Sequence, residues 1–186
     1  MITVRTEHSR ELENLFNSPI SEIRRQGHIL LGRAINRAAT AGRTRASIRI
    51  REKYVIKAGD IKKSIKMRKA SVNRLAAEIR ASGPLTPLMK FDVTPTFPDH
   101  MIVRARVKKG GKKAVDNGFV ARTGNGHVNV FTRVGASRLP IKGRYGPSVA
   151  QMMGNDEVIY DIFDRTQEIL NDRLEHELTR FLRGEF

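Results

Sequence analysis

Residues 20–38 read ISEIRRQGHILLGRAINRA, and this stretch decides the fold. Apolar and small residues recur in it at spacings of three and four, at Ile20, Ile23, Gly27, Leu30, Leu31, Ala34, Ile35 and Ala38. That spacing puts them on one stripe of a helix, whereas the arginines of the segment fall mostly off the stripe. Asn17-Ser18-Pro19 is a start signal and Ala41-Gly42 a stop signal, so the sequence predicts an amphipathic helix over residues 17–40.

A second helical pattern occupies the end of the chain. Large apolar residues keep helical spacing from residue 158 to residue 182. Asn155-Asp156 offers a cap, and the helix dipole favours acidic side chains in a first turn. We therefore predict a helix over residues 156–183 that is acidic on its outer face. It either covers the sheet as a second layer or packs between subunits.

The region between these helices carries the patterns of short strands. Apolar residues alternate with polar ones before the turn Ser82-Gly83-Pro84, which indicates a hairpin. Residues 101–107 alternate with basic residues on one face, and Asn125-Gly126 favours a second tight hairpin. Residues 44–54 fit a strand or an ordered loop. These patterns predict a basic β-rich region over residues 44–135.

Together the patterns predict one fold class. The chain is expected to form a single α+β domain over residues 1–186, in which an antiparallel β-sheet packs with a long N-terminal helix and a long C-terminal helix. Its length suits one domain of ordinary size.

The chain is strongly basic, and its charge is unevenly distributed. It carries 35 Lys and Arg against 19 Asp and Glu, a formal net charge of +16. Residues 43–80 hold 13 basic and 3 acidic residues, residues 101–146 hold 11 and 1, and residues 155–186 hold 4 and 9. The basic middle region either neutralises nucleic-acid phosphates or meets the acidic end of the next subunit in a head-to-tail ring. The third interpretation of this charge distribution is that the charged residues only form a solvated surface.

Several classes of chemistry are missing from the sequence. Cysteine is absent, which excludes disulfides, thiolate nucleophiles and Cys-ligated zinc. The five histidines lack metal-ligand spacing, no GxxxxGK[ST] loop occurs, and the acidic residues suggest no catalytic pair. No apolar run approaches the roughly 20 residues of a membrane-spanning helix. We therefore expect no enzymatic activity, no metal, no cofactor and no membrane partner.

Three motifs follow one another in the second half of the chain: GHVNVFTR at 126–133, RLPI at 138–141 and YGPSVAQM at 145–152. Together they resemble the minor tail protein Z family of tailed bacteriophages. Upstream blocks, such as AINRA at 34–38 and SGPLTPL at 82–88, resemble that family as well. Arg144-Tyr145 stands where the family usually has leucine-tyrosine before the glycine, which is a small departure.

This resemblance implies a structural role in tail completion. Such a protein joins the head-proximal end of the tail late in assembly and enables the tail to attach to a filled head, near the leading DNA end. The implied partners are further copies of the chain in a neck ring, commonly sixfold, a tail terminator or tail-tube protein, a head-side connector protein and the phage DNA end. The implied location is the tail or neck of the virion, after assembly in the host cytoplasm.

The sequence contains two sets of candidate functional residues. The candidates for facing nucleic acid are Arg104, Arg106, Lys108, Lys109, Lys112 and Lys113. The candidates for subunit docking are Leu139, Pro140, Ile141, Tyr145, Gly146, Pro147 and Val149. The prolines favour a rigid extended segment, which we call the docking arm (residues 136–154). The alternatives are a loop that covers its own core and, for the whole chain, a sequence-independent nucleic-acid-binding module. The absence of Trp and the three Tyr weaken binding by base stacking.

Overall fold

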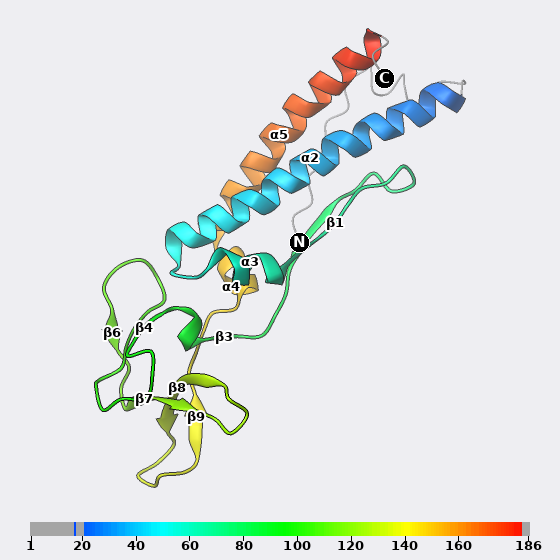
Figure 1. Cartoon of the computed structure of the whole chain (residues 1–186). Helices are drawn as coiled ribbons and strands as arrows, with labels where there is room; N and C mark the ends of the chain where they lie inside the picture. Colours follow the sequence, from blue (N-terminus) through cyan, green and yellow to red (C-terminus); the bar gives the residue numbers. More distant parts are fainter. Residues whose placement is uncertain (1–16, 18–20, 184–186) are drawn as a thin grey trace. The chain divides into compact units, whose positions relative to one another are not determined.

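The computed structural model describes residue 17 and residues 21–183 (Figure 1). Ser18 and Pro19 of the predicted start signal lie outside the described residues. The chain divides into two compact units. The first comprises Met1–Ala46, Ile65–Arg80 and Asp156–Phe186, and the second comprises Ser47–Ser64 and Ala81–Asn155. That the two units fold as one domain stays a prediction.

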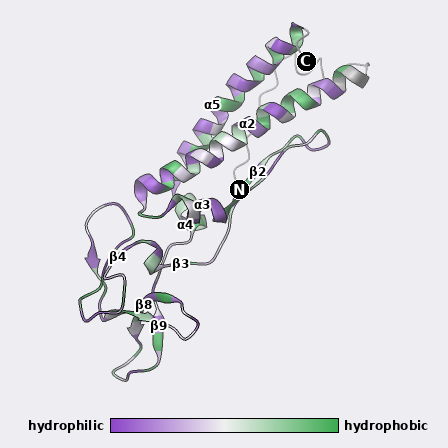
Figure 2. Ribbon diagram, viewed as in Figure 1, coloured by the Kyte–Doolittle hydropathy of each residue, from purple (hydrophilic) through white to green (hydrophobic). Residues whose placement is uncertain are grey.

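Two long helices dominate the first unit and lie side by side (Figure 1). They are α2 (Ser21–Lys53) and α5 (Asp156–Leu182), and both predicted helices are thereby confirmed. Their buried core cluster consists of Leu30, Leu31, Ala34, Ala38, Leu170 and Leu174. Figure 2 shows hydrophilic and hydrophobic residues alternating along both helices, as expected when one face of each helix is buried.

Helix α2 does not end at Ala41-Gly42 but continues to Lys53. Gly42 is buried, and a Cβ atom at this position would collide with the hydroxyl oxygen of Thr166 on α5. Glycine is therefore needed here because another side chain lies close to the backbone, and it does not mark the end of the helix. The prediction of a strand or an ordered loop at residues 44–54 is also wrong, because α2 continues through this segment to Lys53.

The predicted hairpin before Ser82 is confirmed as β1 (Ile65–Arg68) and β2 (Glu78–Ala81), which form a two-stranded sheet. The connection between the strands is attached to α2. The side-chain amide of Asn36 donates to the carbonyl of Ala70 at 3.1 Å and accepts from its N–H at 2.8 Å. A ring nitrogen of His28 lies 3.0 Å from the carbonyl oxygen of Val72. These bonds hold the connection along α2.

The second unit is built from short strands in small antiparallel sheets rather than from one large sheet. One sheet contains β4 (Asp92–Thr94), β5 (Arg104–Arg106) and β6 (Lys113–Ala114). Another contains β7 (Gly118–Arg122), β8 (Val128–Arg133) and β9 (Ile141–Gly143). A third pairs β3 (Thr86–Pro87) with β10 (Tyr145–Gly146). Three short helices complete the unit: α3 (Ala58–Ser64), the 3-10 helix η1 (Leu88–Lys90) and α4 (Val149–Met153).

Two strand predictions in this unit have different outcomes. The hairpin around Asn125-Gly126 is confirmed, because β7 and β8 pair in register with Phe119 opposite Phe131. The strand predicted over residues 101–107 is shorter, because β5 covers only Arg104–Arg106. Met101 and Ile102 are 60% and 70% exposed, so these residues extend from the unit instead of joining the ladder. Because the chain combines long helices with small antiparallel sheets, the α+β class is confirmed.

The docking arm is not extended along its whole length. Its residues form β9, β10 and α4, and β9 pairs with β8 while β10 pairs with β3. Ser148 accepts a hydrogen bond from the amide of Gln151 and its own amide donates to the Gln151 side chain, which caps the start of α4. Residues 134–140 form the connection from β8 to β9, and all of them are exposed.

Candidate functional site

The six basic residues predicted to face nucleic acid lie in the strands β5 and β6 and in the connection between them. Arg104 and Arg106 are two positions apart on β5, so their side chains leave the strand on one face. Strand β6 pairs back onto β5 with Lys113 opposite Ala105. Between these strands, Gly110 has a φ of +133°, a conformation that L side chains rarely adopt. We call residues 107–113 the lysine turn.

Backbone hydrogen bonds fix the base of the lysine turn. The amide of Lys109 donates to the carbonyl of Lys53 at 2.8 Å, and the amide of Val55 donates to the carbonyl of Val107 at 2.9 Å. Tyr54 and Lys108 form an isolated antiparallel bridge. The base of the turn is therefore held through its main chain and not through the side chains of Lys108 and Lys109.

Asp92 on β4 neutralises part of this basic group. It lies opposite Arg106 in the ladder, and its Oδ2 accepts from Nη2 of Arg106 at 2.7 Å. Its Oδ1 lies 2.8 Å from Nζ of Lys112. Lys112 also donates to the hydroxyl of Thr94 at 2.6 Å. Two of the six candidate cations are therefore paired within their own sheet.

These contacts also set the ionisation of Asp92. The hydrogen bond from Lys112 holds the pKa of the Asp92 carboxyl below its ordinary value of 3.8, with a smaller contribution from Arg106, while partial burial acts in the opposite direction. Asp92 consequently stays ionised at neutral pH and keeps its two cations in place.

The other four candidate cations, Arg104, Lys108, Lys109 and Lys113, are exposed. None of them has an ion pair among the residues that the structure describes. They are brought together by β5, the lysine turn and β6. We call these four residues the exposed basic set.

A cavity of about 730 Å³ lies beside the lysine turn. Its apolar lining comes from Tyr54, Leu88, Val107, Val115 and Pro147, and lysines of the turn complete it. An apolar hollow next to ammonium groups suits contact with protein side chains as well as with phosphates. This face therefore has the mixed character of an assembly surface.

The structure does not bring the predicted docking residues together on one surface. Leu139 and Tyr145 are 67% and 52% exposed, whereas Val149 is buried at the start of α4. Gly146 is half-buried, and a Cβ atom there would collide with the ring of Phe91. Pro140 is exposed, and Ile141 and Pro147 are half-buried. One end of the arm is thus exposed and the other belongs to the core, and subunit docking by the arm stays a prediction.

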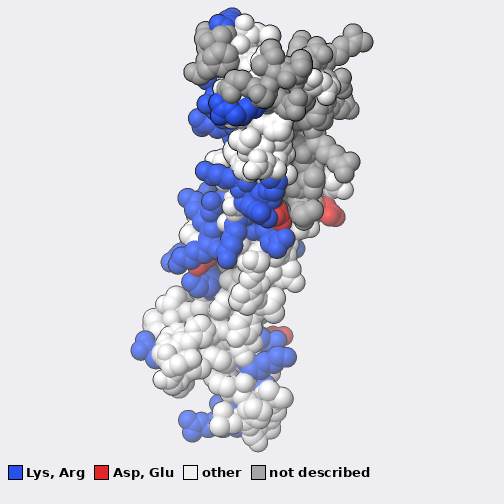
Figure 3. Space-filling view, turned by 90° about the vertical axis from the view of Figure 1, so that its right-hand side faces the viewer, with Lys and Arg blue, Asp and Glu red and all other residues white. Residues whose placement is uncertain are grey.

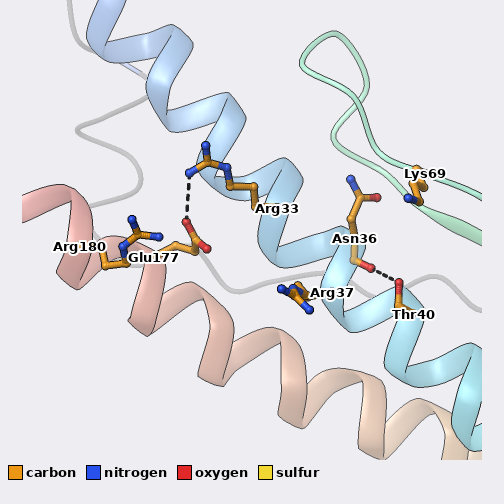
Figure 4. Close-up of a pocket in the computed structure, with 7 residues that line it drawn as sticks. All are labelled: Arg33, Asn36, Arg37, Thr40, Lys69, Glu177 and Arg180. Carbon is orange, nitrogen blue, oxygen red and sulfur yellow. Dashed lines mark hydrogen bonds and ion pairs between the residues drawn. The ribbon is translucent and has the colours of Figure 1, made fainter. Parts of the chain in front are cut away.

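A basic cavity in the first unit, shown in Figure 4, was not predicted from the sequence. Its volume is about 620 Å³, and its charged lining comes from Arg33, Arg37, Lys69, Glu177 and Arg180. Arg33 and Arg37 are four residues apart, so they share a face of α2. That spacing was visible in the sequence, but the contributions of the hairpin and of α5 depend on tertiary packing.

Figure 3 shows one face of the molecule on which Lys and Arg side chains gather, with few acidic side chains among them. In the described part of the chain, no helix combines the length and apolar character that crossing a membrane requires. Within the same residues, no group of three or more His, Cys, Asp or Glu side chains is arranged to hold a metal ion.

The family model described as prophage minor tail protein Z (GPZ) matches residues 10–185, which is nearly the whole chain. No curated protein matches the chain. No solved structure matches it either.

Proposed function

This chain belongs to the prophage minor tail protein Z family, and from that premise we propose that it is a tail-completion or neck subunit. The family consists of minor tail proteins of prophages, so the chain is a structural protein of a phage tail and part of the virion. In the proposed role it forms a ring, caps the head-proximal end of the tail and enables head–tail joining near the DNA end.

The observation that carries this proposal is the exposed basic set. Its four cations have no ion pair among the described residues, although Asp92 pairs with both neighbouring cations. A cluster of exposed cations beside an apolar hollow favours an anionic partner, because like charges held together raise the free energy of the isolated protein. The DNA end at the head–tail junction is such a partner.

Exposed apolar side chains supply a second line of support. Leu139 of the docking arm and Phe97, Met101 and Ile102 of the loop between β4 and β5 are each at least 60% exposed. Large apolar side chains in this position favour burial against other proteins. In the proposed ring they contact neighbouring subunits or the tail and head proteins on either side.

Charge reversal in the lysine turn tests the proposal. The triple variant Lys108→Glu, Lys109→Glu and Lys113→Glu leaves the Asp92 pairs intact, so we expect it to fold normally. In a phage that depends on this chain, tails should still assemble, while joining to filled heads or retention of DNA should fail. Electron microscopy of lysates and plaque titres measure these outcomes.

A matched control reverses three exposed cations of the same unit that lie outside both the lysine turn and the docking arm, Lys57→Glu, Lys63→Glu and Arg122→Glu. This variant changes the net charge by the same amount, so it should support head joining if position matters. Normal infectivity of the lysine-turn variant would remove the turn from the mechanism. Equal loss in both variants would show that net charge alone is responsible.

A further inference from the structure

The loop between β4 and β5 carries several exposed apolar side chains. Phe97 is 62% exposed, Met101 60% and Ile102 70%. Large apolar side chains that gather on one loop favour burial against another protein. We call residues 96–102 the apolar tip.

The backbone of the apolar tip is restricted and anchored at both ends. Pro95 and Pro98 lie on either side of Phe97, and each fixes its own φ and biases the residue before it toward extended conformations. Pro95 and Val103 are buried, and the carbonyl of Val103 accepts from the amide of Val115 at 2.8 Å. These restraints lower the conformational entropy that the tip loses when it binds a partner.

The apolar tip also carries a carboxylate. With histidine neutral, Asp99 is the charged residue of this segment. It is exposed, and its Oδ1 accepts from the amide of His100 at 2.7 Å. It has no ion pair among the residues that the structure describes. A carboxylate among apolar side chains fits a surface that offers cations beside an apolar hollow.

The cavity beside the lysine turn is such a surface. All the residues that line it belong to the second unit. Its apolar lining includes the buried side chains of Tyr54 and Leu88, and Lys108, Lys109 and Lys113 line it as well. Its volume of about 730 Å³ lies within the range of about 300–1,000 Å³ that is typical of ligand pockets. The cavity can therefore take more than one side chain.

The apolar tip does not fill the cavity of its own chain. Phe97, Asp99, Met101 and Ile102 are exposed and do not line that cavity. Strands β4, β5 and β6 pair antiparallel in chain order, so their two successive connections leave the sheet at opposite ends. The apolar tip is the first of these connections and the lysine turn is the second. The two surfaces can thus serve two different neighbours.

A second exposed apolar loop fits the cavity less well. Val134 and Leu139 are 65% and 67% exposed in the connection from β8 to β9. That connection contains Arg138 and no acidic residue. Its cation would meet the lysines that line the cavity, and like charges brought together weaken a contact. Charge therefore favours the apolar tip as the occupant.

We infer that the apolar tip of one copy of this chain inserts into the cavity beside the lysine turn of the next copy, with Asp99 facing the lysines that line it. The contact joins two different surfaces, so each copy uses its tip for one neighbour and its cavity for another, as a closed ring requires. This inference rests on the proposed ring and names the surfaces that form it. One carboxylate neutralises one cation, so the rest of the exposed basic set stays positive.

Cysteine cross-linking tests the contact directly, because the chain has no cysteine of its own. One variant carries His100→Cys in the apolar tip, and the other carries Ala114→Cys in the cavity lining. Both positions are exposed, and each chain then has a single thiol, so a cross-link must join two copies. With a bismaleimide, the mixture of the two variants should give a covalent dimer that neither variant gives alone. Denaturing gels and mass spectrometry measure this product.

A matched control moves the first thiol to the other exposed loop. Ser137→Cys lies in the connection from β8 to β9 and is exposed as well. Mixed with the Ala114→Cys variant, it should give much less covalent dimer than the His100→Cys variant gives. Equal yields from both mixtures would show that the links come from random collisions, and the inference would then be wrong.

Loss of apolar side chains should also weaken association between copies. Phe97→Ser with Ile102→Ser leaves every cation in place and should lower the affinity by roughly a hundredfold, as loss of two central anchors does. Asp99→Lys should lower it by about tenfold or more, because like charges then meet. Leu85→Ser with Tyr160→Ser is the control, since these side chains are 51% and 68% exposed in other elements.

Light scattering after size exclusion, on the full chain over a range of concentrations, measures the association. Thermal unfolding of each variant checks that loss of assembly is not loss of fold. The inference is overturned by a wild-type chain that stays monomeric, by a tip variant that associates like wild type, or by a control that loses as much. If the tip variant assembles normally while the lysine-turn variant fails in head joining, the contact is wrong and the tail-completion proposal stands.

Discussion

Gly42 and Thr166 show how one missing side chain shapes the helix pair. The hydroxyl of Thr166 donates to the carbonyl of Ile162 at 2.6 Å, so it is held against the backbone of α2 and cannot turn away without losing that bond. A β-carbon at residue 42 would therefore push the helices apart or displace a bonded hydroxyl.

We predict that Gly42→Ala lowers the free energy of unfolding by about 1–3 kcal/mol, as overpacking in a core does. Gly32 of the same helix is the matched control, because among the described residues no atom beyond its chain neighbours and its own helical turns lies within 4 Å of a Cβ placed there. Gly32→Ala should raise stability by up to about 1 kcal/mol through helix propensity alone. Urea unfolding followed by circular dichroism measures both.

The second substitution Thr166→Ala should recover part of the loss caused by Gly42→Ala, since it removes the colliding oxygen. Equal stability of Gly42→Ala and Gly32→Ala would contradict this account of the contact.

Glycine in a sequence signals either a helix end or a close approach of another element to the backbone. Residue 42 was misread because the side chain that requires glycine lies more than a hundred positions away.

At the scale of elements, helices were more predictable than strands. The stripe in residues 20–38 repeats over several turns, and a repeated period identifies an element. Strands β4, β5 and β6 have two or three residues each, which is too short for any period to appear. The six basic candidates were found from composition, but their pairing was not, because Asp92 meets Arg106 only through strand register.

The pairing of Asp92 makes the sheet sensitive to acid. Because its pKa is lowered in the folded chain, the stabilising contribution is complete above the ordinary value of 3.8 and is lost as the pH falls through the lower folded value. We predict that Asp92→Asn is less stable than wild type near neutral pH by about 1 kcal/mol or less, as for partly exposed pairs. The difference should shrink below pH 4.

Thermal unfolding across an acidic pH series measures that difference. Asp116→Asn serves as the control, because Asp116 is exposed and has no ion pair among the described residues. A gap between Asp92→Asn and wild type that stays constant down to the lowest pH would show that the carboxylate acts by packing and not by charge.

At the scale of the whole molecule, opposite charges along the sequence are partly matched within the chain. Arg45 of α2 binds Asp161 of α5 through both carboxylate oxygens, and Arg33 approaches Glu177. The acidic residues of α5 thus form two groups, because some of them pair with α2 and others are exposed. Sequence counts revealed the imbalance but not this division, because it depends on which side of α5 faces α2.

The exposed basic set predicts how DNA binding depends on salt. If its four cations contact phosphates, the logarithm of the association constant should fall with the logarithm of salt concentration at a slope of about −3 to −4. The triple lysine-turn variant should remove about three quarters of that slope. Fluorescence anisotropy with a short duplex at several salt concentrations measures the slope.

Assembly state separates the two functional readings in that experiment. A ring with weak DNA affinity agrees with the tail-completion proposal. A monomer with a much steeper slope would instead favour a general nucleic-acid-binding module.

The family was identifiable from short motifs in the sequence, whereas the exposed and buried parts of the docking arm became distinct only in the fold.

Asn36 makes the position of an entire connection depend on one amide group. Aspartate there would accept the Ala70 N–H but leave the opposing carbonyl without its donor, and glutamine would carry its amide one carbon too far. The reach and direction of Lys69 are thus decided on a different element from its own. Substitution of Asn36 would therefore change where the positive charge of Lys69 lies in the basic cavity without altering any charged residue.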